Sequence, residues 1–244
     1  MNYLATIKFV GTAYHGSQIQ ENALTVQEVF QNALKRVLGY LPDIKCCSRT
    51  DSGVHANAFC ISFFSTKDMD TLKMCMALNM ALPRDIAVVD CKLVPDDFHA
   101  RYSALKKQYV YRVYNARVMD PFQYGRAAHI IAPLNEQKLD RAAKLFIGEH
   151  DFSSFCSIKC KKGNTVRTVY SFDVTRSKDE VLFCVEADGF LYNMVRIMVG
   201  ALLNTESGKL SEQQLCEYLY GRQRDNLLFT APAEGLYLNK VTYD

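Results

Sequence analysis

The chain has 244 residues, 49% of them apolar, so it is long enough to bury a core without disulfides or metals, and its composition excludes an intrinsically disordered protein. The net charge of +3 at pH 7 does not by itself indicate a nucleic-acid partner. No apolar run approaches the roughly 20 residues that a helix needs to cross a bilayer, so we expect a soluble protein that makes no use of a membrane.

The first half of the chain alternates predicted strands and helices. Tyr3–Val10 alternates as a strand does, and a polar loop follows it up to residue 22. Thr25 and Glu28 have the spacing of a capping box, and the apolar residues behind them share one face of a helix that Gly39 ends. The other elements predicted here are strands at Ala58–Ser65 and Ile86–Leu93 and a helix at Asp70–Leu82.

The pattern resets near residues 98–105, where a second, strand-rich half begins. Its predicted strands are Lys107–Tyr114, Thr165–Thr175, Val181–Ala187 and Tyr237–Thr242, and its predicted helices are Asn135–Phe146, Phe190–Leu203 and Ser211–Tyr220. Each half joins a sheet to helices on one side of it, which predicts an α+β protein. We expect two subdomains, residues 1–103 and residues 104–244.

The nine cysteines are odd in number and lie mostly within apolar runs. Cys46–Cys47 and Cys156/Cys160 are the only close groupings, and neither has the C-x-x-C spacing of a zinc site, so we predict no metal. The chain leads from Met1 directly into a strand-like run rather than a secretory leader. Reduced thiols in a cytoplasmic protein fit this pattern best.

One dense polar segment, residues 48–56, is the strongest candidate for chemistry, because the phosphate-binding, dinucleotide, esterase and zinc-protease motifs are all missing from the sequence. Arg49, Asp51 and His55 share this segment with hydroxyl side chains. A loop at the edge of a sheet is a common place for functional residues. Spacing alone favours a tight turn in which Asp51 accepts backbone hydrogen bonds and Gly53 supplies a positive φ.

Arg49–Ala56 resembles the G-R-T-D-A-G-V-H-A segment of the TruA family of tRNA pseudouridine synthases. Other short segments resemble the same family in the same order, so the resemblance covers essentially the full length. These segments are Gly11–Gly16, Thr25–Gln27, Phe98–Arg101, Lys107–Tyr111, His150–Phe155, Val166–Thr168, Met194–Arg196 and Thr230–Pro232.

The resemblance implies an RNA-modifying isomerase that converts uridine to pseudouridine in the anticodon stem-loop of tRNA. It implies two similar subdomains whose mostly antiparallel sheets meet around a central cleft, with helices on the outer side. It also implies a cytoplasmic homodimer. Because the reaction is an isomerisation, it implies no cofactor and no nucleotide.

Asp51 matches the family's catalytic aspartate, and Arg196 matches the arginine that pairs with it. From the residues alone, an arginine in the apolar stretch around Arg196 either reaches out to solvent or is paired. Tyr109 matches the tyrosine that stacks on the target base, whereas Tyr111 has the position of an ordinary cross-strand aromatic.

Other residues are candidates for binding RNA. Arg49 is a candidate for a phosphate or for the space that an extruded base leaves, and His55 for an RNA contact or a purely structural role. Lys107 is a candidate for a phosphate contact, together with Lys106, Lys159, Lys161 and Lys162, each of which has an ordinary solvated charge as its alternative.

Three positions depart from the family pattern. Ser17 stands where the family usually has tryptophan, Val10 where it has aspartate and Ser48 where it has glycine. The first two lie in a loop expected to meet RNA, which leaves the same chemistry on ribosomal RNA or at other tRNA positions as an alternative. A non-catalytic RNA-binding or folding factor is a more distant alternative. A hydrolase is weaker still, because no second carboxylate or metal cluster accompanies Asp51.

Overall fold

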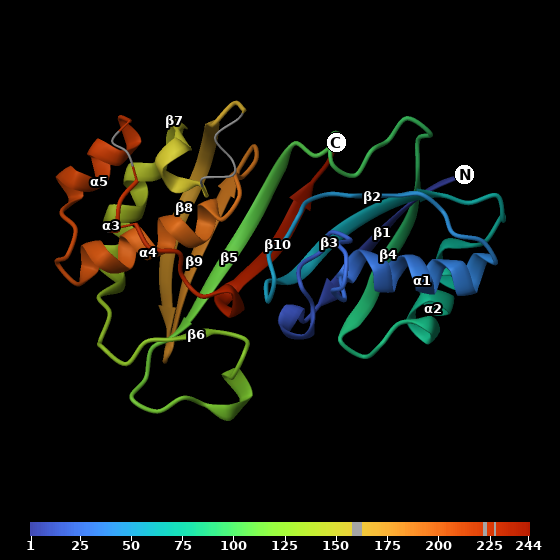
Figure 1. The fold of residues 1–244 in the computed structure, drawn as a ribbon, viewed down its shortest axis with the longest axis horizontal. Coiled ribbons are helices and arrows are strands. Elements are labelled where there is room, and N and C mark those ends of the chain that lie inside the picture. Colours follow the sequence, from blue (N-terminus) through green and yellow to red (C-terminus); the bar gives the residue numbers. More distant parts are fainter. Residues whose placement is uncertain (158–162, 222–223, 227) are drawn as a thin grey trace. The chain divides into compact units, whose positions relative to one another are not determined.

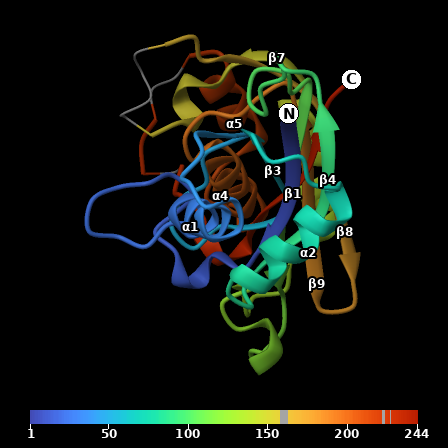
Figure 2. The same ribbon diagram turned by 90° about the vertical axis from the view of Figure 1, so that its right-hand side faces the viewer.

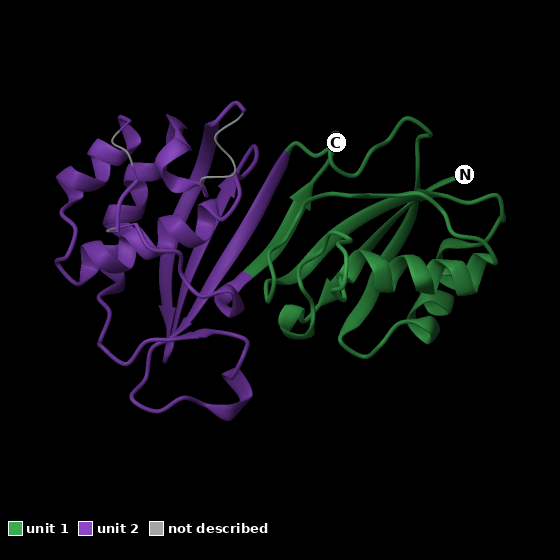
Figure 3. Ribbon diagram, in the orientation of Figure 1, with its two compact units in different colours: residues 1–105, 237–244 green, residues 106–236 purple. Residues whose placement is uncertain are grey.

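The computed structural model describes residues 1–157, 163–221, 224–226 and 228–244. The chain divides into two compact units, one of Met1–Leu105 with Tyr237–Asp244 and one of Lys106–Leu236 (Figure 3). The expected subdomains, 1–103 and 104–244, differ from these units chiefly in the last strand. That strand belongs to unit 1 because it pairs with a strand of unit 1.

Unit 1 is built on a mostly antiparallel sheet (Figure 1). Its centre is β1 (Asn2–Phe9), which pairs antiparallel with both β3 (His55–Phe64) and β4 (Ile86–Val94). The short strand β2 (Ile44–Cys46) pairs antiparallel with the far end of β3. At its beginning, β3 pairs in parallel with β10 (Leu236–Thr242), which returns from the end of the chain.

The two helices of unit 1 lie next to each other on one side of this sheet (Figures 1 and 2). α1 (Val26–Leu38) begins where the Thr25 hydroxyl accepts the Glu28 N–H and ends at Gly39, whose φ is 86°. α2 (Thr71–Ala81) is capped by the Asp70 carboxylate. α1 therefore starts and stops where its capping residues predict, and α2 lies within one residue of the predicted Asp70–Leu82 at each end.

The core of unit 1 lies between the sheet and α1. Tyr3 and Phe63 stack with ring centroids 5.6 Å apart, and Phe30 of α1 meets Phe63 edge-on at 6.4 Å. The Tyr3 hydroxyl donates to the Met69 carbonyl at 2.6 Å, so the one polar atom of this buried ring is satisfied. The sheet whose strand β3 follows the Asp51 turn is thus tightly packed against α1.

Unit 2 has a similar plan, with strands of its own. β5 (Lys106–Tyr114), β9 (Glu180–Ala187), β8 (Val166–Ser177) and β7 (Gly148–Asp151) follow one another as antiparallel neighbours. The two-residue strand β6 (Ala128–His129) pairs in parallel with β5. β2, β6 and β7 are too short to leave a periodic signal, and for that reason the sequence does not predict them.

Three helices accompany the strands of unit 2. They are α3 (Glu136–Ala143), α4 (Met194–Glu206) and α5 (Glu212–Leu219). α3 packs on β8, α4 packs on α3 and β5, and α5 packs on α4 (Figure 1). Asn135 caps α3 and Ser211 forms a full capping box with Gln214, as predicted. One-turn 3₁₀ helices occur at Gly11–Ala13, Pro121–Gln123, Lys144–Phe146, Phe152–Phe155 and Ala233–Gly235.

The predicted start of α4 at Phe190 is wrong by four residues, since the helix begins at Met194. Asn193 has a φ of 63° and lies in the left-handed region, which a right-handed helix cannot contain. The apolar residues before it are buried by a turn rather than by a helix. Periodicity does not distinguish these two ways of burying Leu191.

The α+β class with mostly antiparallel strand pairing is confirmed in both units. Within the residues that the structure describes, no helix is long and apolar enough to span a membrane. Every cysteine among these residues is a free thiol. Burial raises the pKa of Cys46 and of Cys91 to about 12 each, so both thiols stay protonated at neutral pH.

Candidate active site

Asp51 lies in unit 1, at the first position of a tight turn that leads into β3. The Val54 N–H donates to the Asp51 carbonyl at 3.2 Å, and Gly53 has a φ of 79° at the third position of the turn, as a type II turn requires. The predicted turn is therefore present. Its hydrogen bond uses the backbone of Asp51, so the turn does not by itself account for a carboxylate at this position.

The loop at residues 11–24 holds the Asp51 turn from one side. The Tyr14 carbonyl accepts the Gly53 N–H and the Ser52 hydroxyl, each at 3.3 Å. The Tyr14 ring is buried, and its hydroxyl donates to Asp85 at 2.8 Å. Burial and the Asp85 carboxylate raise the pKa of Tyr14, so its hydroxyl remains a proton donor in this anchoring bond.

Two glycines of this loop lie too close to the turn for any side chain. A Cβ on Gly16 would lie 2.5 Å from the Thr50 carbonyl oxygen, and a Cβ on Gly11 would lie 1.9 Å from the Val54 carbonyl oxygen. Gly16 also has a φ of 85°, which favours glycine. The first loop and the segment around Asp51, which both resemble the family, thus form one packed structure.

His55 is the first residue of β3 and is buried, with 1% of its surface exposed. Its Nδ1 accepts the Gly11 N–H at 2.9 Å, and its ring stacks on Tyr237 of β10 with centroids 4.6 Å apart. A ring fixed in this way joins the first loop to the closing strand. These contacts favour the structural role for His55 over the RNA contact.

Arg49 is exposed, two residues before Asp51. It lines a cavity of about 240 Å³ together with Lys45 and Arg101, which sequence reasoning did not single out as binding residues. Arg101 belongs to one of the segments that resemble the family, and no role followed from its position in the sequence. Only the fold brings it next to Arg49.

Arg196 lies in the first turn of α4, in unit 2, and is half-buried. Its Nε donates to the Ala231 carbonyl at 2.7 Å and its Nη1 donates to Asn193 Oδ1 at 3.0 Å. The guanidinium is therefore held inside its own unit rather than extended into solvent. The left-handed Asn193 that begins α4 thus supplies one of its acceptors.

Tyr109 is on β5 with 5% of its surface exposed, and its ring meets Phe190 edge-on with centroids 5.0 Å apart. Tyr111 lies two residues along the same face and is fully buried. The Tyr111 hydroxyl donates to the Pro232 carbonyl at 2.8 Å, which confirms it as a core aromatic. The segment Thr230–Pro232 therefore anchors both Tyr111 and Arg196, a role that the sequence did not indicate.

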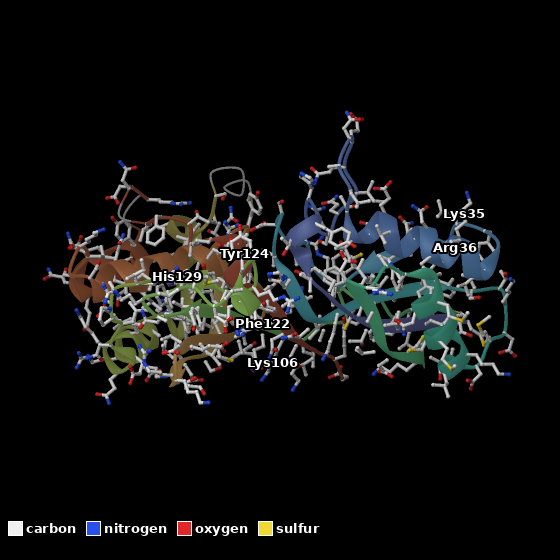
Figure 4. All side chains as sticks on the ribbon, turned by 90° about the horizontal axis from the view of Figure 1, so that it is seen from below. Lys35, Arg36, Lys106, Phe122, Tyr124 and His129 are labelled. Carbon is white, nitrogen blue, oxygen red and sulfur yellow. The ribbon has the colours of Figure 1, made fainter. Side chains whose placement is uncertain are left out.

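Lys107 is half-buried on β5 opposite Ala187. Lys106, labelled in Figure 4, lies 3.5 Å from the Glu186 carboxylate and 4.8 Å from the centre of the Tyr170 ring. The Glu186 carboxylate and the Tyr170 ring stabilise the positive charge of Lys106. Lys159, Lys161 and Lys162 lie outside the described residues.

The candidate residues thus form two groups. Arg49, Asp51 and His55 lie together in unit 1, whereas Lys107, Tyr109 and Arg196 lie in unit 2. Across the described part of the chain, no group of three or more His, Cys, Asp or Glu residues is placed to hold a metal ion.

The sequence model described as tRNA pseudouridine synthase matches residues 5–103 and 142–244, which is most of the chain and includes Arg49, Asp51, His55 and Arg196. Lys107 and Tyr109 lie between the two matched ranges. The chain belongs to the tRNA pseudouridine synthase family. The resemblance seen in the short motifs is thereby confirmed, and the protein is an RNA-modifying isomerase.

Curated relatives agree along their full length. The tRNA pseudouridine synthase A of Thermoanaerobacter sp. (strain X514) is 43% identical over 242 residues, covering 99% of each chain. The protein of the same name from Staphylococcus aureus (strain MRSA252) is 41% identical, covering 100% of this chain and 92% of its own. That of Listeria monocytogenes serotype 4b (strain CLIP80459) is also 41% identical, covering 99% of each.

A solved crystal structure of a Cbf5-Nop10-Gar1 complex aligns with 83% of this chain and 54% of its own. The identity is 12% and the TM-score is 0.39, so this likeness carries no weight here.

Ser17, which replaces the tryptophan usual in the tRNA pseudouridine synthase family, is buried and hydrogen-bonded to the segment that carries Asp51. Its hydroxyl accepts the Thr50 N–H at 2.8 Å, and its own N–H donates to the Thr50 carbonyl at 3.1 Å. Val10 is half-buried and its N–H donates to the Asp85 carbonyl at 2.9 Å. The Ser17 side chain therefore helps to hold the loop, whereas the bond at Val10 is made by the backbone and does not depend on which side chain stands there.

Ser17→Ala is expected to destabilise the protein by about 1–3 kcal/mol, because it leaves the buried Thr50 N–H without its acceptor. Turnover should fall as well, since Thr50 precedes Asp51. Urea unfolding and the rate of uridine isomerisation measure the two effects. Ser52→Ala is the matched control: its hydroxyl is exposed and should contribute less than about 0.5 kcal/mol. Equal effects of the two variants would show that the hydrogen bond between Ser17 and Thr50 has no special importance.

Proposed function

We propose that the protein isomerises uridine to pseudouridine in the anticodon stem-loop of tRNA, with Asp51 as its catalytic carboxylate. The observation that carries the proposal is the packing around Asp51. Two segments that resemble the family interlock there through Gly11, Gly16 and Ser17. A group that must act on one sugar position benefits from such a rigid mount, because small misplacements are costly in rate.

The reaction changes the atom of uracil through which the base is joined to the ribose. The bond from ribose C1′ to uracil N1 breaks, the freed base turns, and a bond from C1′ to C5 forms. The hydrogen of C5 leaves as a proton and N1 gains one, so nothing is oxidised and no cofactor is consumed. What the reaction needs from the protein is an ionised carboxylate beside the sugar, and an aspartate is ionised at neutral pH.

We assign Arg196 as the partner that orients this carboxylate. A guanidinium holds a carboxylate in a fixed geometry through two parallel hydrogen bonds. The bonds from Arg196 to Ala231 and Asn193 fix its side chain before any substrate arrives. The proposal therefore places a pre-oriented cation, rather than a mobile one, in this role.

We assign Tyr109 as the aromatic surface against which the target base turns. Stacking on a flat ring is worth about 1–3 kcal/mol and does not fix the rotation of the base. The edge-on contact with Phe190 holds the ring of Tyr109 in place. Arg49 and Lys107 are proposed as contacts to the RNA backbone, and a cytoplasmic homodimer as the working form of the protein.

Tritium release from RNA labelled at C5 of uridine tests the proposal, because forming the new bond expels that hydrogen. We expect release from bulk tRNA and from a synthetic anticodon stem-loop with the purified protein alone. Release only from ribosomal RNA would keep the chemistry and overturn the target. No release from any RNA would instead support the non-catalytic RNA-binding factor.

A further inference from the structure

A cavity of about 240 Å³ opens in unit 1 beside the Asp51 turn. Arg49, Lys45 and Arg101 line it, from the loop before the turn, from β2 and from the segment after β4. No carboxylate lines it, and all residues of unit 1 are described. The walls of this basic cavity therefore carry three permanent positive charges and no permanent negative one.

Little in the surroundings neutralises these charges. Asp43 pairs with Lys45, but both side chains are largely exposed, and such surface pairs are weak. The first N–H groups of α1, at Val26 and Gln27, already donate to the carbonyls of Gly16 and Ser17. An anion in the basic cavity would therefore be bound by the long cationic side chains and not by the helix backbone.

The segment that supplies Arg101 is fixed to the sheet. The Ala100 N–H donates to Ser62 Oγ at 3.1 Å, and the Tyr243 hydroxyl donates to the Ala100 carbonyl at 2.7 Å. His99 Nδ1 accepts the backbone N–H of Arg101 at 3.0 Å. Burial and the charges of Lys45 and Arg101 lower the pKa of His99, so it remains the neutral acceptor that this turn needs.

Tyr102 provides an aromatic surface at the mouth of the basic cavity. Its side chain is highly exposed, at 76%, yet its ring is held 4.4 Å from His99 and 5.6 Å from the Arg101 guanidinium, measured from the ring centroid. An exposed ring held next to a guanidinium, in a cavity lined by further cations, is an arrangement with which proteins bind single-stranded nucleic acid. The ring stacks a base and the cations follow the backbone.

We propose that the basic cavity binds a nucleotide adjacent to the target uridine, with its phosphate held by Lys45, Arg49 and Arg101 and its base stacked on Tyr102. Arg49 and Asp51 are two residues apart and so at most about 7 Å from each other along the chain. The occupant is therefore a neighbour of the reacting nucleotide in the same RNA. The inference rests on the proposed function, and it assigns to Tyr102 a role in choosing the RNA context.

The test compares variants for binding to an anticodon stem-loop RNA and for tritium release at saturating RNA. Tyr102→Ala is expected to weaken binding about 5- to 150-fold, and Tyr102→Phe, which keeps the ring, to bind as the wild type does. Arg101→Ala should reduce the slope of log affinity against log salt by about 0.7–0.9. Lys35→Ala is the charge control, because Lys35 points outward near the end of α1 and does not line the basic cavity (Figure 4).

At saturating RNA, Lys35→Ala should bind the RNA and release tritium as the wild type does, since Lys35 does not line the basic cavity. Unchanged affinity in Tyr102→Ala together with an unchanged salt slope in Arg101→Ala would overturn the inference while the wild type still isomerises uridine. Wild-type protein that binds the RNA but releases no tritium would instead overturn the proposed function. Thermal unfolding of each variant checks that the exposed substitutions leave the fold intact.

Discussion

Asp51→Ala is expected to lower the rate of tritium release by at least about 10⁴-fold, because removing a group that acts directly on the reacting atoms costs an enzyme this much. Binding of the anticodon stem-loop should stay within a few-fold. The fold should also persist, since the turn at Asp51 is closed by its backbone carbonyl, which alanine retains. Single-turnover release, RNA affinity and the unfolding midpoint measure the three quantities separately.

Asp51→Asn is the matched variant, because it keeps the shape of the side chain and removes only the charge. It should be as inactive as Asp51→Ala. A variant that unfolds would favour the view that Asp51 serves the turn. An Asp51→Asn protein with wild-type activity would remove the carboxylate from the mechanism.

Gly16→Ala is expected to destabilise unit 1 by about 2–4 kcal/mol and to lower turnover about 100-fold. The positive φ of Gly16 costs an L-residue about 1–2 kcal/mol. The new Cβ would also lie 2.5 Å from the Thr50 carbonyl oxygen, a backbone atom that only moves with the segment carrying Asp51. A shift of about 1 Å at a reacting group is enough for a loss of this size in rate.

Gly208→Ala separates the cost of the positive φ from the cost of the close Cβ contact. Gly208 has a φ of 77°, and a Cβ there would meet nothing within 4 Å. This variant should lose only the backbone contribution in urea unfolding and keep full turnover. If Gly16→Ala behaves like Gly208→Ala in both measurements, the close approach of the first loop does not position Asp51.

Local signals in the sequence predicted the elements that stand on caps and regular periodicity. α1 begins at Thr25 and ends at Gly39 because both ends are specified within a few residues. The start of α4 was predicted wrongly, because no local signal in the sequence indicates that Asn193 adopts the left-handed conformation. The short strand β2 was not predicted, because its position depends on pairing with β3, which is distant in the sequence.

In the candidate site, too, local features were predictable from the sequence and long-range contacts were not. Asp51 and Gly53 stood out as a turn in sequence, and the turn is present. The sequence did not predict that His55 is buried, because Gly11 and Tyr237, which enclose it, are both distant from it in the chain. The basic cavity was missed because no periodic pattern brings Lys45, Arg49 and Arg101 together.

The pairing of the last strand with β3 has a consequence for how the protein is made. Residues leave the ribosome from the amino end, so unit 1 must wait for all of unit 2 before β10 emerges. Until then His55, at the base of the Asp51 turn, lacks the ring of Tyr237 that covers it. The loop proposed to carry the chemistry is therefore among the last parts of the molecule to be completed, and an unfinished chain holds no fully assembled site.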